Sequence, residues 1–257
     1  MKKFDLHKVP IKKFPRLLFV SIISFIIGIC VLLAAGYNIL MSHLDMEYDM
    51  KIQDNVVKCA DENQPLNLKI DFASLGKRNP DIIGWVYLPG TIINYPVVQT
   101  NENETYLHER FDGDASDYGT IFADYRCDSH DGNNLILYGH NQSQFNPVKF
   151  SILYNYLTDE EFIKEHPYFE YYDAATGKGR IYKIFSVVRA DITTQENIKS
   201  YYRNVPDEAY ADYLSWLQSQ SLVLSDVAVD PTKKSLLLST CTDDADWQRV
   251  LVCCQEN

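Results

Sequence analysis

The sequence predicts a mainly β domain with helical insertions, preceded by a single N-terminal transmembrane helix. Short runs rich in β-branched and aromatic residues recur along the chain, separated by turn signals. Two stretches with helical periodicity interrupt them, and residues 17–40 contain no charged residue. With 257 residues, of which 46% are hydrophobic and 23% charged, the chain suits one folded domain plus an anchor rather than a disordered protein.

The uncharged run, LLFVSIISFIIGICVLLAAGYNIL, is long enough for a membrane span, which needs about 20 apolar residues. Six of the 24 basic residues and one of the 35 acidic residues lie within residues 1–16. The positive-inside rule then predicts a cytoplasmic basic tail (1–16), a transmembrane anchor (17–40) and an extracellular body, hence a single-pass protein of the cell membrane. The alternative is a cleaved signal peptide ending near 34–36, but the run is longer than a typical signal core.

After the anchor, Leu44, Tyr48, Ile52 and Val56 recur at four-residue spacing, which predicts an amphipathic helix over 44–58. The polar segment 61–67 is then expected to be a short linker. We therefore expect an N-terminal helix and linker over 41–67 and an extracellular catalytic domain over 68–257.

Within that domain eight strands are expected, at 82–88, 92–98, 120–124, 134–138, 168–172, 182–190, 235–240 and 249–252. Helical segments are expected at 147–164 and 206–220. The first contains Thr158-x-x-Glu161, a capping-box pattern that predicts the start of a second short helix. Short strands with a few helices between them indicate a β-barrel or a sandwich.

Several functions are excluded by charge and cysteine pattern. The body is strongly acidic, which argues against a nucleic-acid partner. The six cysteines include no C-x-x-C pair and are not spaced like a disulfide framework. Cys127 and His130 lack a second ligand pair, and the aspartates of 243–246 lack EF-hand spacing, so we expect no metal and no cofactor.

The last two expected strands carry the clearest chemical signal. SLLLSTC brings an apolar strand to Cys241, and after a polar loop RVLV restarts a strand at Arg249. An antiparallel hairpin would place these two residues at one rim of the sheet. NLILYGHN delivers His140 to a strand end in the same way. A thiolate nucleophile, an imidazole acid/base and a guanidinium that holds negative charge together suit acyl transfer.

Spacing by itself leaves simpler interpretations open. Free cysteines are often small buried core residues, so Cys241 can be one. Arg249 can be a surface cation beside the neighbouring aspartates, and a lone histidine such as His140 at a strand end is often structural.

Two segments resemble the signatures of the sortase family: LSTC followed shortly by an Arg-led apolar strand, and YGHN at the end of an earlier strand. DIIGWVYLPGTIINYPVVQ followed by NETYL resembles the start of class B sortases, and the likeness extends over about residues 81–252. The resemblance implies an eight-stranded β-barrel. It also implies a cysteine transpeptidase that cleaves a C-terminal sorting motif of secreted proteins after Thr, through a thioacyl intermediate. The acceptor is then a peptidoglycan precursor or cross-bridge amine.

The same resemblance implies roles for further residues. Asn103, Leu107 and Ser239 match substrate-contacting positions of class B sortases, and the helix expected over 206–220 matches the one that precedes their cysteine strand. Thr242 departs from members with an acidic residue there, and the loop between the cysteine and the arginine is short for the family.

Three alternatives stay open at this point. A sortase that polymerises pilins would use a pilin lysine as acceptor, and a secreted cysteine protease would only hydrolyse its substrate. A membrane-tethered binding domain would have no catalysis at all, and Cys241 would then react with electrophiles no faster than the other cysteines.

Overall fold

The computed structural model describes residues 16–54, 56–58, 64–141, 147–193, 205–241 and 248–257. The chain divides into two compact units, residues 1–41 and 42–257. The first is dominated by α1 (Arg16–Gln53), whose stretch from Phe19 is apolar and long enough to cross a membrane, as a signal sequence also can be. Its apolar side chains up to Leu40 are largely exposed, which fits either an anchor or a signal.

The end of α1 differs from the expectation. The helix stops at Gln53 rather than continuing to residue 58, because Val56 lies in β1 (Val56–Lys58), which pairs with β2 (Leu68–Ile70). A β-branched pair, VVK, suits a strand better than a last helical turn. The second compact unit begins at Ser42, and the last turns of α1 bury Ile52 within it.

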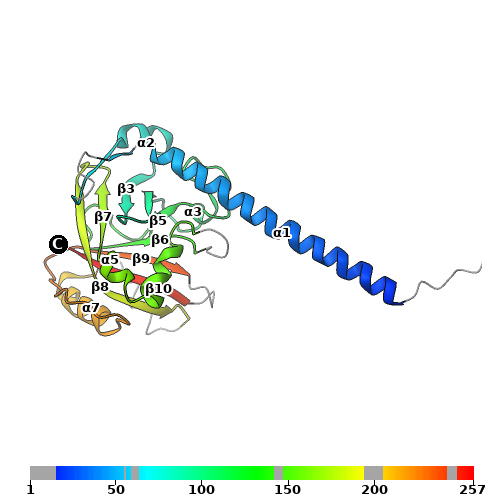
Figure 1. Ribbon diagram of the computed structural model, residues 1–257. Coiled ribbons are helices and arrows are strands. Elements are labelled where there is room, and N and C mark those ends of the chain that lie inside the picture. The colour runs from blue at the N-terminus through cyan, green and yellow to red at the C-terminus, as the bar shows by residue number, and fades with distance from the viewer. Residues whose placement is uncertain (1–15, 55, 59–63, 142–146, 194–204, 242–247) are drawn as a thin grey trace, which may run out of the picture. The chain divides into compact units, whose positions relative to one another are not determined.

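The second unit is built on a closed barrel of eight strands in the order β10-β8-β7-β3-β4-β5-β6-β9 (Figure 1). Two neighbouring pairs, β4–β5 and β6–β9, are parallel and the others are antiparallel. All eight expected strands are confirmed. They are β3 (Ile82–Tyr87), β4 (Asn94–Val98), β5 (Ile121–Ala123), β6 (Asn134–Tyr138), β7 (Tyr168–Asp173), β8 (Gly179–Asp191), β9 (Ser235–Cys241) and β10 (Gln248–Glu256).

The helical insertions are shorter than the sequence indicated. Segment 147–164 forms η2 (Ser151–Tyr154), α4 (Asn155–Thr158) and α5 (Phe162–Glu165) instead of one long helix. A second short helix is confirmed, but the capping box is wrong. The Thr158 hydroxyl donates back to the Tyr154 carbonyl, and the Asp159 side chain instead accepts from the Glu161 amide. Two short helices were not anticipated, α2 (Phe72–Arg78) and α3 (Thr105–His108).

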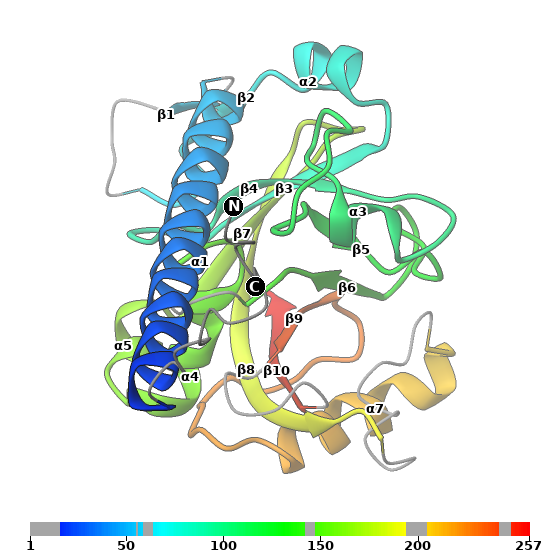
Figure 2. The same cartoon turned by 90° about the vertical axis from the view of Figure 1, so that its right-hand side faces the viewer.

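The expected helix over 206–220 is confirmed as α7 (Asp207–Ser219). Figure 2 shows it beside β8. Its apolar face is buried against β8, β9 and β10, through Tyr210, Tyr213, Leu214 and Leu217. Burying a leucine side chain stabilises a fold by about 1.5–3 kcal/mol, so this face fixes α7 on the strand pair that leads to and from Cys241.

Candidate active site

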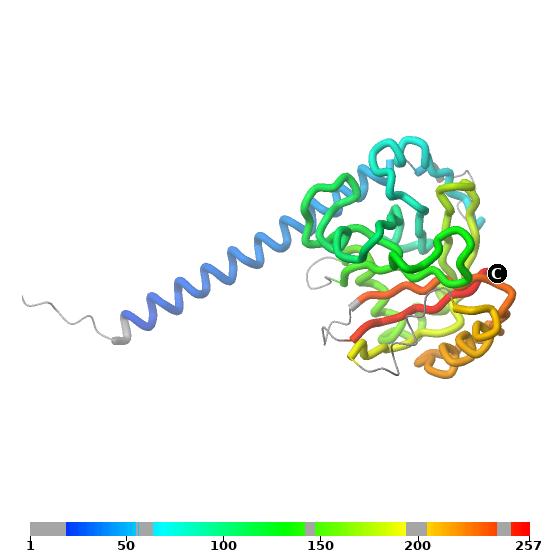
Figure 3. Tube along the Cα trace, turned by 180° about the vertical axis from the view of Figure 1, so that it is seen from behind, coloured from blue at the N-terminus to red at the C-terminus, as the bar shows by residue number. Residues whose placement is uncertain are grey.

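Three neighbouring strands deliver the three candidate catalytic residues to one rim of the barrel. In the parallel pair β6–β9, Tyr138 is opposite Ser239, so His140 and Cys241 each follow two residues beyond the same level. In the antiparallel pair β9–β10, Cys241 is directly opposite Arg249. Figure 3 shows β9 and β10 running side by side as the orange-red and red strands near the C-terminus.

Hydrogen bonds beyond the strand ladder hold the ends of β6 and β9 together. The Gly139 amide donates to the Ser239 carbonyl at 3.2 Å, and the Thr240 hydroxyl donates to the Gly139 carbonyl at 2.8 Å. Gly139 itself has no room for a side chain, because a Cβ there would lie 2.5 Å from Ile121 Cδ1 and 2.7 Å from Phe150 Cδ2. The glycine therefore allows the end of β6 to pack closely against Ile121 and Phe150, and this fixes the backbone position from which His140 follows.

The His140 ring is held by a backbone carbonyl. Its Nε2 lies 2.8 Å from the Leu107 oxygen, and a carbonyl only accepts, so Nε2 carries the proton in this contact. Burial of the ring lowers the pKa of His140 below its usual 6.5, the Leu107 carbonyl opposes that shift, and the charges of His108 and Lys149 add to it. The ring is thus neutral at pH 7, with Nδ1 holding a lone pair.

Arg249 and Cys241 are the paired residues at the loop end of the β9–β10 hairpin. Arg249 is half-buried, and its Nη1 donates to the Gln248 carbonyl at 2.9 Å. For Cys241 the structure describes the backbone within β9. Thr242 and the aspartates of 243–246 lie outside the described residues.

The other described cysteines make poor nucleophiles for a peptide. Cys127, Cys253 and Cys254 are all buried. Burial raises the pKa values of the Cys253 and Cys254 thiols far above their usual range, so neither forms a thiolate readily. Cys30 is exposed but belongs to the apolar part of α1.

The three residues expected to contact substrate have different surroundings. Asn103 is half-buried, and its Oδ1 accepts from the Tyr125 amide at 3.0 Å. Leu107 is half-buried in α3, and its carbonyl binds the His140 ring. Ser239 is only 1% exposed, and its carbonyl belongs to the β6–β9 junction.

A pocket of about 540 Å³ opens at the other end of the barrel, where Lys183 of β8 and Glu256 of β10 line it. Lys183 is paired with Gln255, next to Glu256 near the end of β10, whereas Arg249 lies near the start of that strand. The pocket is therefore separate from the rim that carries His140, Cys241 and Arg249.

Sequence patterns did not indicate the groups that hold His140. The Leu107 carbonyl is a backbone atom, which no side-chain motif can reveal. Lys149, whose charge acts on the His140 ring, belongs to no recognisable motif and is only 3% exposed. A useful signal was present only for Gly139, as part of the YGHN segment.

No family model matches the sequence. Among characterised proteins, sortase B of Staphylococcus aureus is 31% identical over 231 residues, covering 88% of this chain and 90% of that protein. A solved Staphylococcus aureus sortase B–substrate complex has a TM-score of 0.63 at 30% identity, covering 72% of this chain and 84% of that one. A sortase B complexed with triglycine has a TM-score of 0.64 at 30% identity, covering 72% and 85% of the two chains.

Proposed function

The chain belongs to the sortase B family of cysteine transpeptidases, and we propose that it cleaves a C-terminal sorting motif after Thr and transfers the product to a cell-wall amine. One observation carries the assignment of roles: the strand register brings the ends of β6 and β9 and the start of β10 to one rim. His140, Cys241 and Arg249 then act as acid/base, nucleophile and oxyanion-side cation.

In the first step the Cys241 thiol gives its proton to Nδ1 of His140, and the thiolate attacks the carbonyl carbon of the Thr. Arg249 donates hydrogen bonds to the oxygen that gains negative charge. The C–N bond then breaks, the leaving amine takes the proton from the His140 imidazolium, and a thioester remains on Cys241. The Leu107 carbonyl favours the charged imidazolium, since Nε2 donates to it throughout.

In the second step a primary amine attacks the thioester carbonyl and gives a proton to His140. The C–S bond breaks, the Cys241 sulfur regains a proton, and a new amide is released. A related sortase B has been solved with triglycine, whose terminal amine has the chemistry required of an acceptor. We therefore take a peptidoglycan precursor or cross-bridge amine as the acceptor for this chain.

The peptide substrate belongs to a secreted protein that carries the sorting motif, consistent with the substrate complex solved for the Staphylococcus aureus relative. The Leu107 carbonyl lies 2.8 Å from His140 Nε2, and Asn103 precedes Leu107 by four residues, so a peptide bound along this segment would present its scissile carbonyl to the rim. The buried position of Ser239 favours a structural role at the β6–β9 junction over direct contact with the peptide.

Single-turnover acylation tests the nucleophile. Full-length protein in detergent micelles is mixed with a sorting-motif peptide, and the adduct is measured by mass spectrometry with and without triglycine. We expect a thioester adduct in the wild type, its conversion to a new amide with triglycine, and neither product in Cys241→Ala. Turnover by Cys241→Ala would refute the mechanism, and hydrolysis unaffected by triglycine would make the protein a protease.

The same assay separates two roles for Arg249. Lysine keeps the charge but loses the planar fork that donates two hydrogen bonds at once. If Arg249 binds the oxyanion, Arg249→Lys slows acylation by roughly 100- to 1000-fold, the usual loss for one such donor. Near-normal acylation by a variant with an unchanged melting temperature would remove Arg249 from the mechanism.

A further inference from the structure

The last turns of α1 place two carboxylates inside the second unit. Asp45 is fully buried and Asp49 is 8% exposed, one turn apart on the same helix face. Burial raises the pKa of the Asp49 carboxyl, and the Lys149 ammonium opposes that shift. Buried carboxylates are costly unless they are paired, so the partners of these two define what the helix end does.

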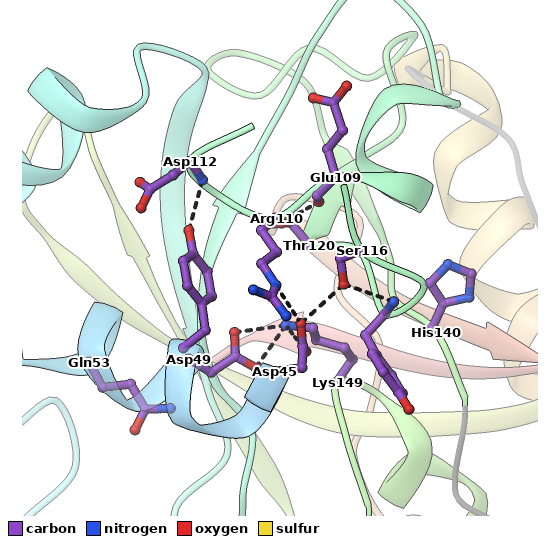
Figure 4. A network of polar contacts seen from close by, with 12 residues as sticks. Asp45, Asp49, Gln53, Glu109, Arg110, Asp112, Ser116, Thr120, His140 and Lys149 are labelled. Atoms are coloured by element: carbon purple, nitrogen blue, oxygen red, sulfur yellow. Dashed lines mark hydrogen bonds and ion pairs between the residues drawn. The ribbon is translucent and has the colours of Figure 1, made fainter. Parts of the chain in front are cut away.

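The partners are two buried or half-buried cations from separate segments (Figure 4). Lys149 Nζ lies 2.8 and 2.7 Å from the two Asp49 oxygens and 3.2 Å from Asp45 Oδ2. Arg110 Nε lies 3.1 Å from Asp45 Oδ1, which also accepts from the Ser116 hydroxyl at 3.1 Å. Two negative and two positive charges thus form one compact network.

Lys149 is held in an unusual backbone conformation. Its φ is +49°, in the left-handed region that residues other than glycine rarely adopt. Such a conformation is strained and persists only where the surroundings impose it. The buried ion pairs with Asp45 and Asp49, and the Tyr95 ring 5.2 Å from Nζ, are the contacts that hold the residue there.

Each of the two cation-bearing segments contributes a backbone group that contacts His140. Lys149 precedes Phe150, whose amide donates to the His140 carbonyl at 3.2 Å. Arg110 lies three residues after Leu107, whose carbonyl accepts from the His140 ring. The segment of Lys149 therefore contacts the backbone of His140, and the segment of Arg110 contacts its ring. The two aspartates of α1 form ion pairs with both segments.

We propose that Asp45 and Asp49 are positioning residues for His140. The last turns of α1 would then help to set the geometry of the active site. This inference rests on the proposed role of His140 in proton transfer. The ion network, acting through Lys149 and Arg110, keeps the His140 ring against the Leu107 carbonyl.

The test uses full-length protein in detergent micelles with two variants. Asp49→Asn breaks the network and leaves Lys149 buried without its main partner, so we expect a melting temperature lower by roughly 10 °C. Asp49→Leu/Lys149→Met removes both charges, and such apolar replacements are often neutral for stability. We expect its melting temperature to return to near the wild-type value.

Activity and NMR then separate positioning from stability. A misplaced catalytic group costs up to about 100-fold in rate. We expect both variants to lose about 10- to 100-fold in kcat with KM within about twofold. In histidine-labelled protein, the Nε2–H signal of His140, protected by the Leu107 carbonyl in the wild type, should broaden or vanish in both.

Two controls match these changes. Glu256→Gln alters the partner of Arg180, 3.5 Å away at the other end of the barrel, and should leave kcat unchanged. Phe169→Leu lowers stability from β7, which is not adjacent to β6 or β9, and should leave the His140 signal intact. Recovery of kcat and of the signal in the double variant would overturn the inference. A fully active His140→Asn protein would instead overturn the proposed role of His140.

Discussion

The ring of His140 is partly buried, and its Nε2 proton is held by the Leu107 carbonyl. These two facts act on different properties of the side chain. Burial lowers the pKa of the ring and so favours its neutral form, which is the form that the proposed proton transfer requires. The carbonyl selects the tautomer and leaves Nδ1 for chemistry. A single residue thus obtains its charge state and its orientation from two separate causes.

The lowered pKa of His140 gives a pH dependence of stability. Below about pH 6.5 the unfolded chain binds a proton at this histidine, whereas the folded protein resists it. Stability therefore rises with pH in this window, and it is lost as the pH falls from 6.5 through the folded-state pKa.

We expect the melting temperature of the wild type to fall faster than that of His140→Asn as the pH is lowered from 7.5 to 5. Asparagine removes the titrating group, so the difference between the two curves isolates this histidine from the many acidic residues. Parallel curves would show that the folded protein does not resist protonation of His140.

At the scale of elements, the junction between β6 and β9 is the part of the barrel that brings His140 and Cys241 to one level. A parallel pair brings the two strand ends to the same level, so residues equally far beyond Tyr138 and Ser239 become neighbours. The Gly139 amide and the Thr240 hydroxyl then fasten the ends beyond the last paired residues. The antiparallel return of β10 adds Arg249 to the same rim.

Gly139→Ala tests how tightly this junction is packed. The new Cβ would meet Ile121 and the Phe150 ring at distances that real contacts do not reach, so β6 or its neighbours must shift. We expect a loss of about 1–3 kcal/mol in the free energy of unfolding. We also expect a lower rate of transpeptidation at temperatures where the variant is folded, because His140 follows Gly139 directly.

Gly76→Ala is the matched control, measured by thermal unfolding and by the same activity assay. Gly76 lies in α2, and a Cβ there would meet only Ile82 Cγ2, at 3.9 Å. Alanine favours helix over glycine, so stability should rise slightly or stay constant with full activity. If Gly139→Ala behaves like this control, the junction is looser than its contacts indicate.

For the whole molecule, the continuity of α1 joins a helix able to span a membrane to residues that are buried in the second unit. Asp45 and Asp49 follow the apolar stretch on the same helix. Residues 42–53 therefore belong to the same compact unit as the barrel.

Protease treatment of intact cells that have no outer barrier tests the topology. The basic tail of residues 1–16 predicts a cytoplasmic N-terminus, so external protease should remove the body and leave a protected N-terminal fragment. Lysed cells serve as the control, in which both parts are cut. A body that stays intact on unlysed cells would contradict the extracellular assignment.

Residue patterns were sufficient for much of this protein. The eight strand positions, the α7 helix and the pairing of Cys241 with Arg249 followed from local signals: apolar runs, turn residues and the short loop of a hairpin. Local signals suffice there because strand propensity, helix periodicity and hairpin closure depend on residues close in sequence. The resemblance to sortases rested on these same segments.

Only the tertiary structure decided what surrounds His140. The Leu107 carbonyl, the Lys149 ammonium and the carboxylates of Asp45 and Asp49 come from segments about 10 to 100 residues away. The helix predicted over 44–58 ends at Gln53 because Val56 pairs with a strand, and the apolar spacing that predicted this helix did not indicate that Asp45 and Asp49 are buried. A charged side chain becomes buried and paired only when distant segments fold against it. Neither this burial nor a contact with a backbone carbonyl can be recognised from the residues close by in the sequence.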